Sequence, residues 1–157
     1  MSARDLYTPA ERARRDASPW TLVQGVLAPL QFLVMIVSTV LVVRSLSTGA
    51  GVFAADISVV IKTLTLYAIM VTGSLWEKDV FGRYLFAGPF FWEDVVSMGV
   101  IALHTAYMAT LFVGFLSMEG RMVLALVAYA AYGINAAQFL LKLRRARLQA
   151  PRTVATA

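Results

Sequence analysis

The stretch Leu22–Val43, which reads LVQGVLAPLQFLVMIVSTVLVV, decides the fold. It contains no charged residue, and as a helix rising about 1.5 Å per residue it can cross a bilayer core of about 30 Å. Three more runs are similarly apolar: Val52–Trp76, Val95–Leu116 and Met122–Leu141. Lipid offers the backbone no hydrogen-bond partners, and these runs lack the alternation of barrel strands. The sequence therefore predicts an all-α polytopic membrane protein, a bundle of four transmembrane helices.

The composition excludes several other classes of protein. Of 157 residues, 59% are hydrophobic and 15% charged, whereas soluble domains are roughly 45–50% apolar and about 25% charged. The sequence contains no cysteine, which excludes disulfides, thiolate metal sites and a cysteine nucleophile. A single histidine excludes a bis-histidine haem within the chain.

Basic residues fall mainly on one side of the predicted spans. Eleven lie before the first run, between the second and third, or after the fourth: Arg4, Arg12, Arg14, Arg15, Lys78, Arg83, Lys142, Arg144, Arg145, Arg147 and Arg152. Only Arg44 and Arg121 lie in the other connections. The positive-inside rule therefore predicts both termini in the cytoplasm. We interpret these charges as topology signals that also contact anionic lipid, and we expect no nucleic-acid binding.

The chain is predicted to form one membrane domain, 1–157. Residues 1–19 form an interfacial N-terminal segment, 20–141 the bundle and 142–157 a basic cytoplasmic tail. Thr8-Pro9-Ala10-Glu11 has the pattern of a capping box with proline at the first helical position, so a short interfacial helix should follow. We expect Pro29 to bend the first span, and short turns at 47–51 and 119–121.

His104 lies about ten residues into the third helix, close to the middle of the bilayer. Polar groups inside a span are functional candidates, because lipid penalises idle ones. This histidine suits an axial ligand to a tetrapyrrole metal or a proton carrier. The alternative is an imidazole that hydrogen-bonds a neighbouring helix. The residues alone leave these readings open.

Three acids, Glu77, Glu93 and Asp94, cluster where the second span ends and the third begins. Eleven residues are almost three helical turns, so Glu93 should share one stripe with Ser97, Val100, His104 and Tyr107. Glu77 is expected to face Glu93 across the helix pair, and one of two adjacent carboxylates would then hold a proton. The alternatives are a favourable interaction with the helix dipole and an interfacial anchor.

Other polar and aromatic side chains have more ordinary explanations. Lys62, inside the second span, is expected to extend its amine towards the outer membrane surface. Tyr129, Tyr132 and Phe139 share a stripe of the fourth helix, flanked by Asn135, which favours helix packing over a wall for a flat ligand. The sequence contains no phosphate loop, nucleotide motif or zinc pattern.

Long strings of the sequence resemble the bacteriochlorophyllide vinyl hydratases. The resemblance covers nearly the whole chain apart from the last dozen residues and the outer turns. It is carried by Tyr7-Thr8-Pro9, Arg14–Gly25 (RRDASPWTLVQG), Leu66–Gly73 (LYAIMVTG), Trp76–Lys78 (WEK), Phe90–Ser97 (FFWEDVVS) and Leu103–Tyr107 (LHTAY).

The resemblance implies a hydro-lyase of bacteriochlorophyll synthesis in a phototrophic bacterium. It would add water to the C3-vinyl group of chlorophyllide a or a related chlorin, giving a 1-hydroxyethyl group, without a cofactor of its own. We expect it in the inner (intracytoplasmic) membrane. Its partners would be the chlorin and the lipid bilayer, with other enzymes of the pathway and a second copy of the chain as further expectations. The competing hypothesis is a pigment carrier or assembly factor without catalysis.

The chemistry of vinyl hydration suggests roles for the candidate residues. We expect Glu93 or Glu77 to protonate the vinyl group and Asp94 to activate water as the base. His104 or the Asn135 carbonyl would bind the magnesium of the chlorin, since the protein supplies no metal of its own. Tyr107, Tyr129, Tyr132 and Trp92 are the remaining candidates for binding the macrocycle.

Overall fold

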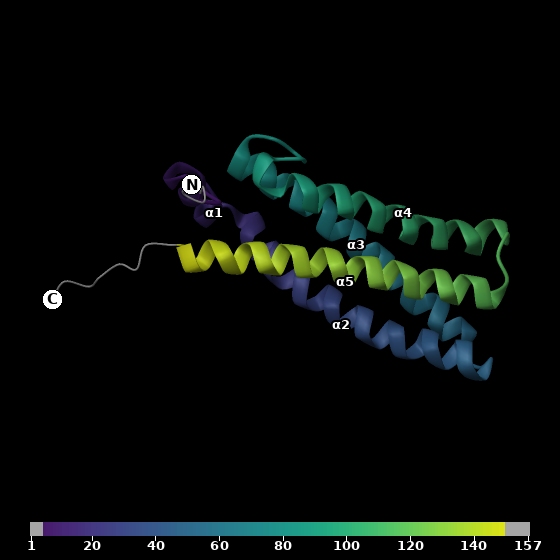
Figure 1. Cartoon of the computed structure of the whole chain (residues 1–157). Helices are drawn as coiled ribbons and strands as arrows, with labels where there is room; N and C mark the ends of the chain where they lie inside the picture. Colours follow the sequence, from purple (N-terminus) through teal and green to yellow (C-terminus); the bar gives the residue numbers. More distant parts are fainter. Residues whose placement is uncertain (1–4, 150–157) are drawn as a thin grey trace.

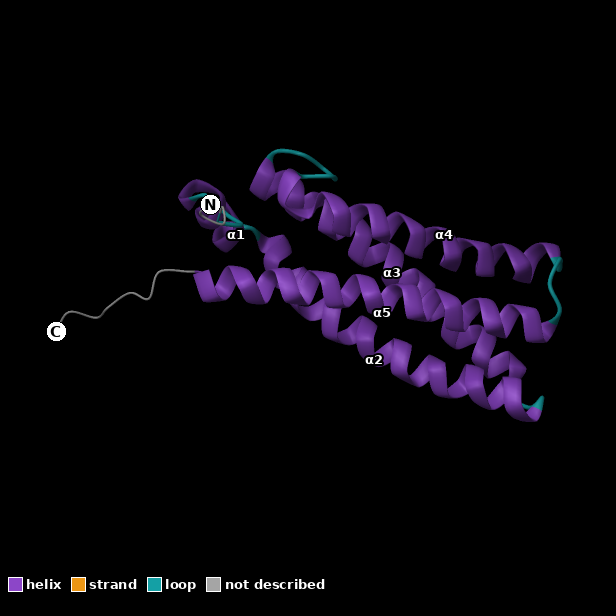
Figure 2. Ribbon diagram, viewed as in Figure 1, coloured by secondary structure: helices purple, strands orange, loops and turns teal. Residues whose placement is uncertain are grey.

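A computed structural model describes residues 5–149, all of whose regular elements are helices (Figures 1 and 2). Arg4 and Arg152, two of the residues counted for topology, and the end of the predicted tail lie outside this range. The elements are α1 (Pro9–Ala17), α2 (Pro19–Thr48), α3 (Val52–Phe81), the 3-10 turn η1 (Gly88–Phe90), α4 (Phe91–Val113) and α5 (Met118–Gln149).

The four long helices run up and down as a bundle (Figure 1). Helix α2 packs mainly on α3 and also on α5, α4 packs mainly on α5, and the contact between α3 and α4 is the smallest of these four. One end of the bundle gathers α1, the α3–α4 connection and the last turns of α5 (Figure 1). We call this the rim end, and the opposite end, with the other two connections, the far end.

The prediction of four membrane-spanning helices is confirmed, and the protein is a multi-pass membrane protein. All four long helices are long and apolar enough to cross a bilayer. Helices α2 and α3 extend beyond the apolar runs because they stop only at left-handed glycines, Gly49 and Gly82, whereas left-handed Gly114 ends α4 at Val113, before the predicted end of its run at Leu116. The turn expected at 119–121 is wrong, since these residues already belong to the first turn of α5.

Helix α1 begins as predicted and is fixed to α3. Thr8 N–H donates to Glu11 Oε2 at 2.7 Å and Glu11 N–H to Thr8 Oγ1 at 3.2 Å, which confirms the capping box. Arg14 Nε donates to the Val80 carbonyl at 2.8 Å, and the Tyr7 ring stacks on Phe81 with centroids 5.9 Å apart. The N-terminal segment therefore covers the rim end of α3.

Lys62 does not extend to the membrane surface, so that expectation is wrong. Its side chain is 0% exposed, its amine donates to Gln31 Oε1 on α2, and it lies 3.5 Å from the centroid of the Tyr132 ring on α5. These two contacts give the ammonium an amide acceptor and an aromatic face inside the bundle. Lys62 thereby joins α2, α3 and α5 at mid-height.

Candidate active site

The predicted acids meet at the rim end, between the end of α3 and the start of α4. Glu77, Glu93 and Asp94 are buried there, with the amine of Lys142 from α5 beside them. We call these four residues the rim cluster. Acidic side chains are rarely buried unless they are paired, so their partners determine what the cluster can do.

Glu77 and Asp94 form a pair that the α3–α4 connection holds in place. The carboxyl groups interact with each other, and each also accepts a backbone hydrogen bond. Phe86 N–H donates to Asp94 Oδ2 at 2.8 Å and Ala87 N–H to Glu77 Oε2 at 3.1 Å. Two neighbouring buried carboxylates repel each other, which favours one proton on the pair. The pair can therefore store a proton close to the start of α4.

The backbone that supplies these two amides is strained. Phe86 has φ of 58°, a left-handed conformation that a bulky residue rarely adopts. Strain of this kind persists where surrounding interactions determine it, and it is common at functional sites. Here the hydrogen bonds to Asp94 and Glu77 hold Phe86 and Ala87 in place.

Glu93 has different partners from the other two acids. Its Oε2 lies 2.6 Å from Lys142 Nζ, and the same amine also donates to the Pro89 carbonyl. The Glu93 carbonyl accepts a hydrogen bond from Asn135 Nδ2 at 2.9 Å, which ties the first turn of α4 to α5. Glu93 is thus ion-paired with Lys142, on the face of α4 that meets α5.

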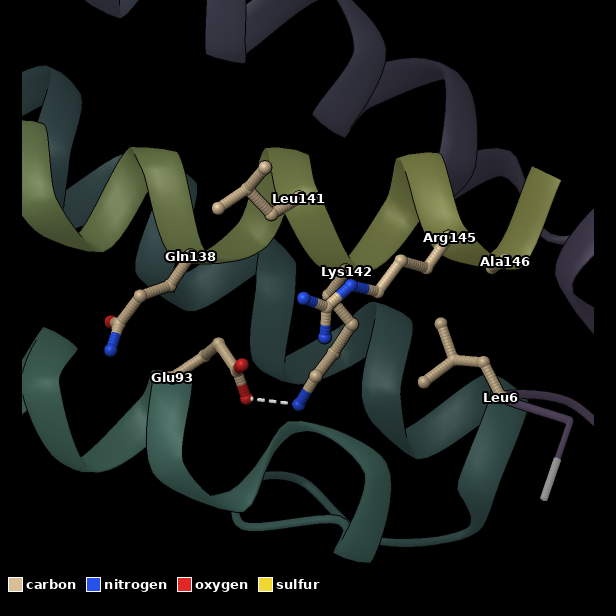
Figure 3. A pocket seen from close by; sticks show the side chains of 7 residues that line it. All are labelled: Leu6, Glu93, Gln138, Leu141, Lys142, Arg145 and Ala146. Atoms are coloured by element: carbon tan, nitrogen blue, oxygen red, sulfur yellow. Dashed lines mark hydrogen bonds and ion pairs between the residues drawn. The ribbon is translucent and has the colours of Figure 1, made fainter. Parts of the chain in front are cut away.

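A pocket of about 340 Å³ opens beside Glu93 (Figure 3). Lys142 and Arg145 of α5 line it, together with Leu6 from the segment before α1. Figure 3 shows the Glu93 carboxylate pointing across this space to the Lys142 amine. Glu93 is therefore the rim carboxyl group that a ligand entering here would meet.

His104 lies deeper in the bundle and is fully buried. Its Nδ1 is 2.8 Å from the Val100 carbonyl, and a carbonyl can only accept, so the ring proton sits on Nδ1. Nε2 then presents a lone pair, and among residues 5–149 it has no hydrogen-bond partner. A histidine that ligates a metal commonly has this arrangement.

The match to a family model covers residues 7–145, and the family is described as 2-vinyl bacteriochlorophyllide hydratase. The chain belongs to this family. A relative from Rhodobacter capsulatus named 2-vinyl bacteriochlorophyllide hydratase is 67% identical over 149 residues, 95% of this chain and 86% of its own. A relative of the same name from Cereibacter sphaeroides is 64% identical over 146 residues, 92% of this chain and 90% of its own. No solved structure matches the chain.

In this member of the hydratase family, the predicted site residues lie at three levels of the bundle. Glu77, Glu93, Asp94, Asn135 and Trp92 lie near the rim end. His104, Tyr129 and Tyr132 lie at mid-height, where the rings of His104 and Tyr129 are 5.8 Å apart. Tyr107 lies towards the far end, about 21 Å along α4 from Glu93. One chlorin cannot touch all three levels in this arrangement.

The stripe predicted on α4 is confirmed, but the expected pairing of Glu77 with Glu93 is wrong. Glu93, Ser97, Val100, His104 and Tyr107 are all buried, as their spacing predicted. Glu77, however, pairs with Asp94 and not with Glu93, because neighbouring residues on a helix point about 100° apart and Asp94 is the one facing the α3–α4 connection.

The aromatic candidates also separate into different environments. Trp92 is 69% exposed, with its ring against Phe91, and does not line the pocket. Tyr129 Oη is 2.5 Å from Ser38 Oγ on α2, as in ordinary helix packing. Tyr132 lies beneath Lys62.

The sequence reasoning missed an ion pair towards the far end. Asp56 of α3 accepts hydrogen bonds from Arg121 Nε at 2.9 Å and from Tyr107 Oη at 2.5 Å. This links α3, α4 and α5, and gives Tyr107 a structural partner far from the rim cluster. Asp56, an acid inside an apolar run, is the sequence signal for this pair, whereas the turn expected at 119–121 gives Arg121 no partner.

Proposed function

We propose that this protein hydrates the vinyl group of a chlorophyllide, as a hydro-lyase of bacteriochlorophyll synthesis. Membership of the 2-vinyl bacteriochlorophyllide hydratase family, with relatives 67% and 64% identical over most of the chain, carries this conclusion. The rim cluster supports it, because vinyl hydration needs one group to give a proton and another to take one.

In the proposed reaction the Glu77–Asp94 pair gives its proton to the terminal vinyl carbon. The resulting cation on the inner carbon is conjugated with the macrocycle, and the nearby carboxylate of Glu93 stabilises it. Water attacks the inner carbon and loses a proton to Glu93, which forms the 1-hydroxyethyl group. Transfer of that proton back to the carboxyl pair restores the site, so the net change is addition of one water molecule.

The position of the pocket supports entry of the chlorin between α4 and α5. Entry between α3 and α4 is less favourable, because the hydrogen bonds from the Phe86 and Ala87 amides occupy the rim end there. Glu93 is the catalytic carboxylate that lines the pocket. The Glu77–Asp94 pair does not line the pocket. The vinyl group must therefore reach the first turn of α4 on binding, where both Glu93 and Asp94 lie.

The proposed enzyme has no metal of its own and lies in the inner membrane. The reaction adds water without a change of oxidation state, so the enzyme needs no cofactor of its own, and the magnesium belongs to the substrate. His104 Nε2 can ligate this magnesium only if the helices around it part, since the side chain is fully buried. We place the protein in the inner membrane with the rim end in the cytoplasm, because the basic residues gather at that end.

Incubation of the purified protein with chlorophyllide a in H₂¹⁸O tests the function. The expected product carries one ¹⁸O atom in the new hydroxyl group, and in D₂O it carries deuterium on the adjacent methyl carbon. A protein that binds chlorophyllide a but returns it unlabelled would be a carrier. That outcome would overturn the proposal.

A further inference from the structure

The pocket beside Glu93 is lined by a cationic side chain that takes no part in the proposed reaction. Lys142 is paired with Glu93, whereas Arg145, one helical turn further along α5, forms no ion pair with any residue in 5–149. Its side chain is exposed, and Figure 3 shows it extending from α5 towards the pocket beside Lys142. A guanidinium group in such a place suits a planar anion, which it can bind through two hydrogen bonds.

The size and lining of the pocket restrict what that anion belongs to. Its volume of about 340 Å³ is near the lower end of ligand sites, which span roughly 300–1,000 Å³. It can hold one edge of a macrocycle but not the whole ring. Leu6, Leu141 and Ala146 provide apolar walls next to the cation. A flat apolar ligand with one anionic substituent matches this combination.

We propose that Arg145 binds the free carboxylate of the chlorophyllide side chain and so selects free acids over esters. A chlorophyllide carries this group as a propionate, and a chlorophyll carries it as an ester without charge. This inference rests on the proposed substrate class and adds the specificity-determining residue. The Leu6 wall is held by Tyr7, which is buried against α3, so the N-terminal segment completes the subsite.

The test compares binding of chlorophyllide a and of its methyl ester, measured by fluorescence in nanodiscs of neutral lipid. Hydrogen bonds to charged groups contribute about 1.5–3 kcal/mol, so the wild-type protein should bind the acid at least about tenfold more tightly. Arg145→Gln should bind acid and ester equally, with its ester affinity unchanged. Arg144→Gln is the matched control, because this neighbouring arginine is exposed but does not line the pocket, and it should keep the wild-type preference.

Two outcomes overturn the inference. One is a wild-type protein that binds acid and ester alike, and the other is Arg145→Gln that retains the preference. A lipid phosphate is the alternative anion, so the binding is repeated in nanodiscs with anionic lipid. If Arg145→Gln weakens lipid association but leaves the ratio of acid to ester affinity unchanged, the arginine binds a lipid phosphate and not the chlorophyllide carboxylate. The readout is binding and does not depend on catalysis. If Arg145→Gln loses the preference for the acid but the wild-type protein hydrates no chlorophyllide, the result contradicts only the proposed function.

Discussion

Single polar side chains inside the bundle are held by specific partners on neighbouring helices. Lys62 and Gln31 illustrate this, since both are fully buried and the Gln31 carbonyl is the hydrogen-bond acceptor for the amine. Removing one partner of a buried hydrogen bond lowers stability more than removing both partners together, because the remaining polar group is left unsatisfied. The pair therefore offers a test of the interior at the level of two residues.

We expect Gln31→Met to destabilise the protein by about 1–3 kcal/mol, because the Lys62 amine loses its acceptor. The double variant Gln31→Met, Lys62→Met should recover most of this loss, because it removes both polar groups from the interior. Thermal unfolding in detergent micelles measures both effects. A single variant as stable as wild type, or a double variant less stable than the single, would show that the contact does not form.

At the scale of the elements, the N-terminal segment is an addition to the four spans, and the Tyr7 ring is its buried aromatic contact with α3. The Tyr7 ring is buried on Phe81, yet its hydroxyl has no hydrogen-bond partner within residues 5–149. Burial raises the pKa of Tyr7 to about 12. The ring, and not the hydroxyl, should therefore hold the segment.

Tyr7→Phe should leave α1 docked, whereas Tyr7→Ala should release it, since removing a buried aromatic ring costs about 3–5 kcal/mol. Hydrogen exchange of the α1 amides, compared between the two variants, measures the docking. The raised pKa adds a pH effect. The contribution of neutral Tyr7 is complete below about pH 10, the unfolded value, and is lost as pH rises to about 12.

Tyr7→Phe should remove this alkaline loss, so the wild-type and Phe proteins should diverge only above about pH 10. Equal exchange in the Ala and Phe variants would contradict the docking role of the ring.

The sequence predicted the elements well and their side-chain partners poorly. Apolar runs and the capping pattern at Thr8 are local features, so four spans and the start of α1 could be read directly. The Glu77–Asp94 pair depends on the conformation of Phe86. Its positive φ cannot be read from the sequence, because the residue there is not a glycine. Lys62 was misplaced because an acceptor on α2 and a ring on α5 become its neighbours only after packing.

At the scale of the whole molecule, the rim end concentrates the carboxyl groups, the pocket and most basic side chains. The native sequence lacks cysteine, so single cysteines can report which face each end occupies. Ser47→Cys marks the far end and Tyr84→Cys the rim end, and both positions are exposed.

A membrane-impermeant maleimide added to intact spheroplasts should label Ser47→Cys and not Tyr84→Cys, because the basic rim end lies in the cytoplasm. Inverted vesicles should reverse the pattern. Labelling of Tyr84→Cys alone in spheroplasts would reverse the orientation and place the pocket outside the cytoplasm.

In the proposed mechanism the carboxyl groups of the rim cluster carry out the hydration, and steady-state turnover of chlorophyllide a tests this most directly. Gln at position 93 or 77 keeps the shape of the side chain but cannot exchange the proton. We predict that Glu93→Gln and Glu77→Gln each lower kcat by at least about 10²-fold, the lower limit for acid–base catalysis, with little change in chlorophyllide affinity.

Glu119→Gln is the matched control, since this exposed acid lies at the far end, and it should turn over at the wild-type rate. Wild-type turnover in both rim variants would contradict the carboxyl mechanism.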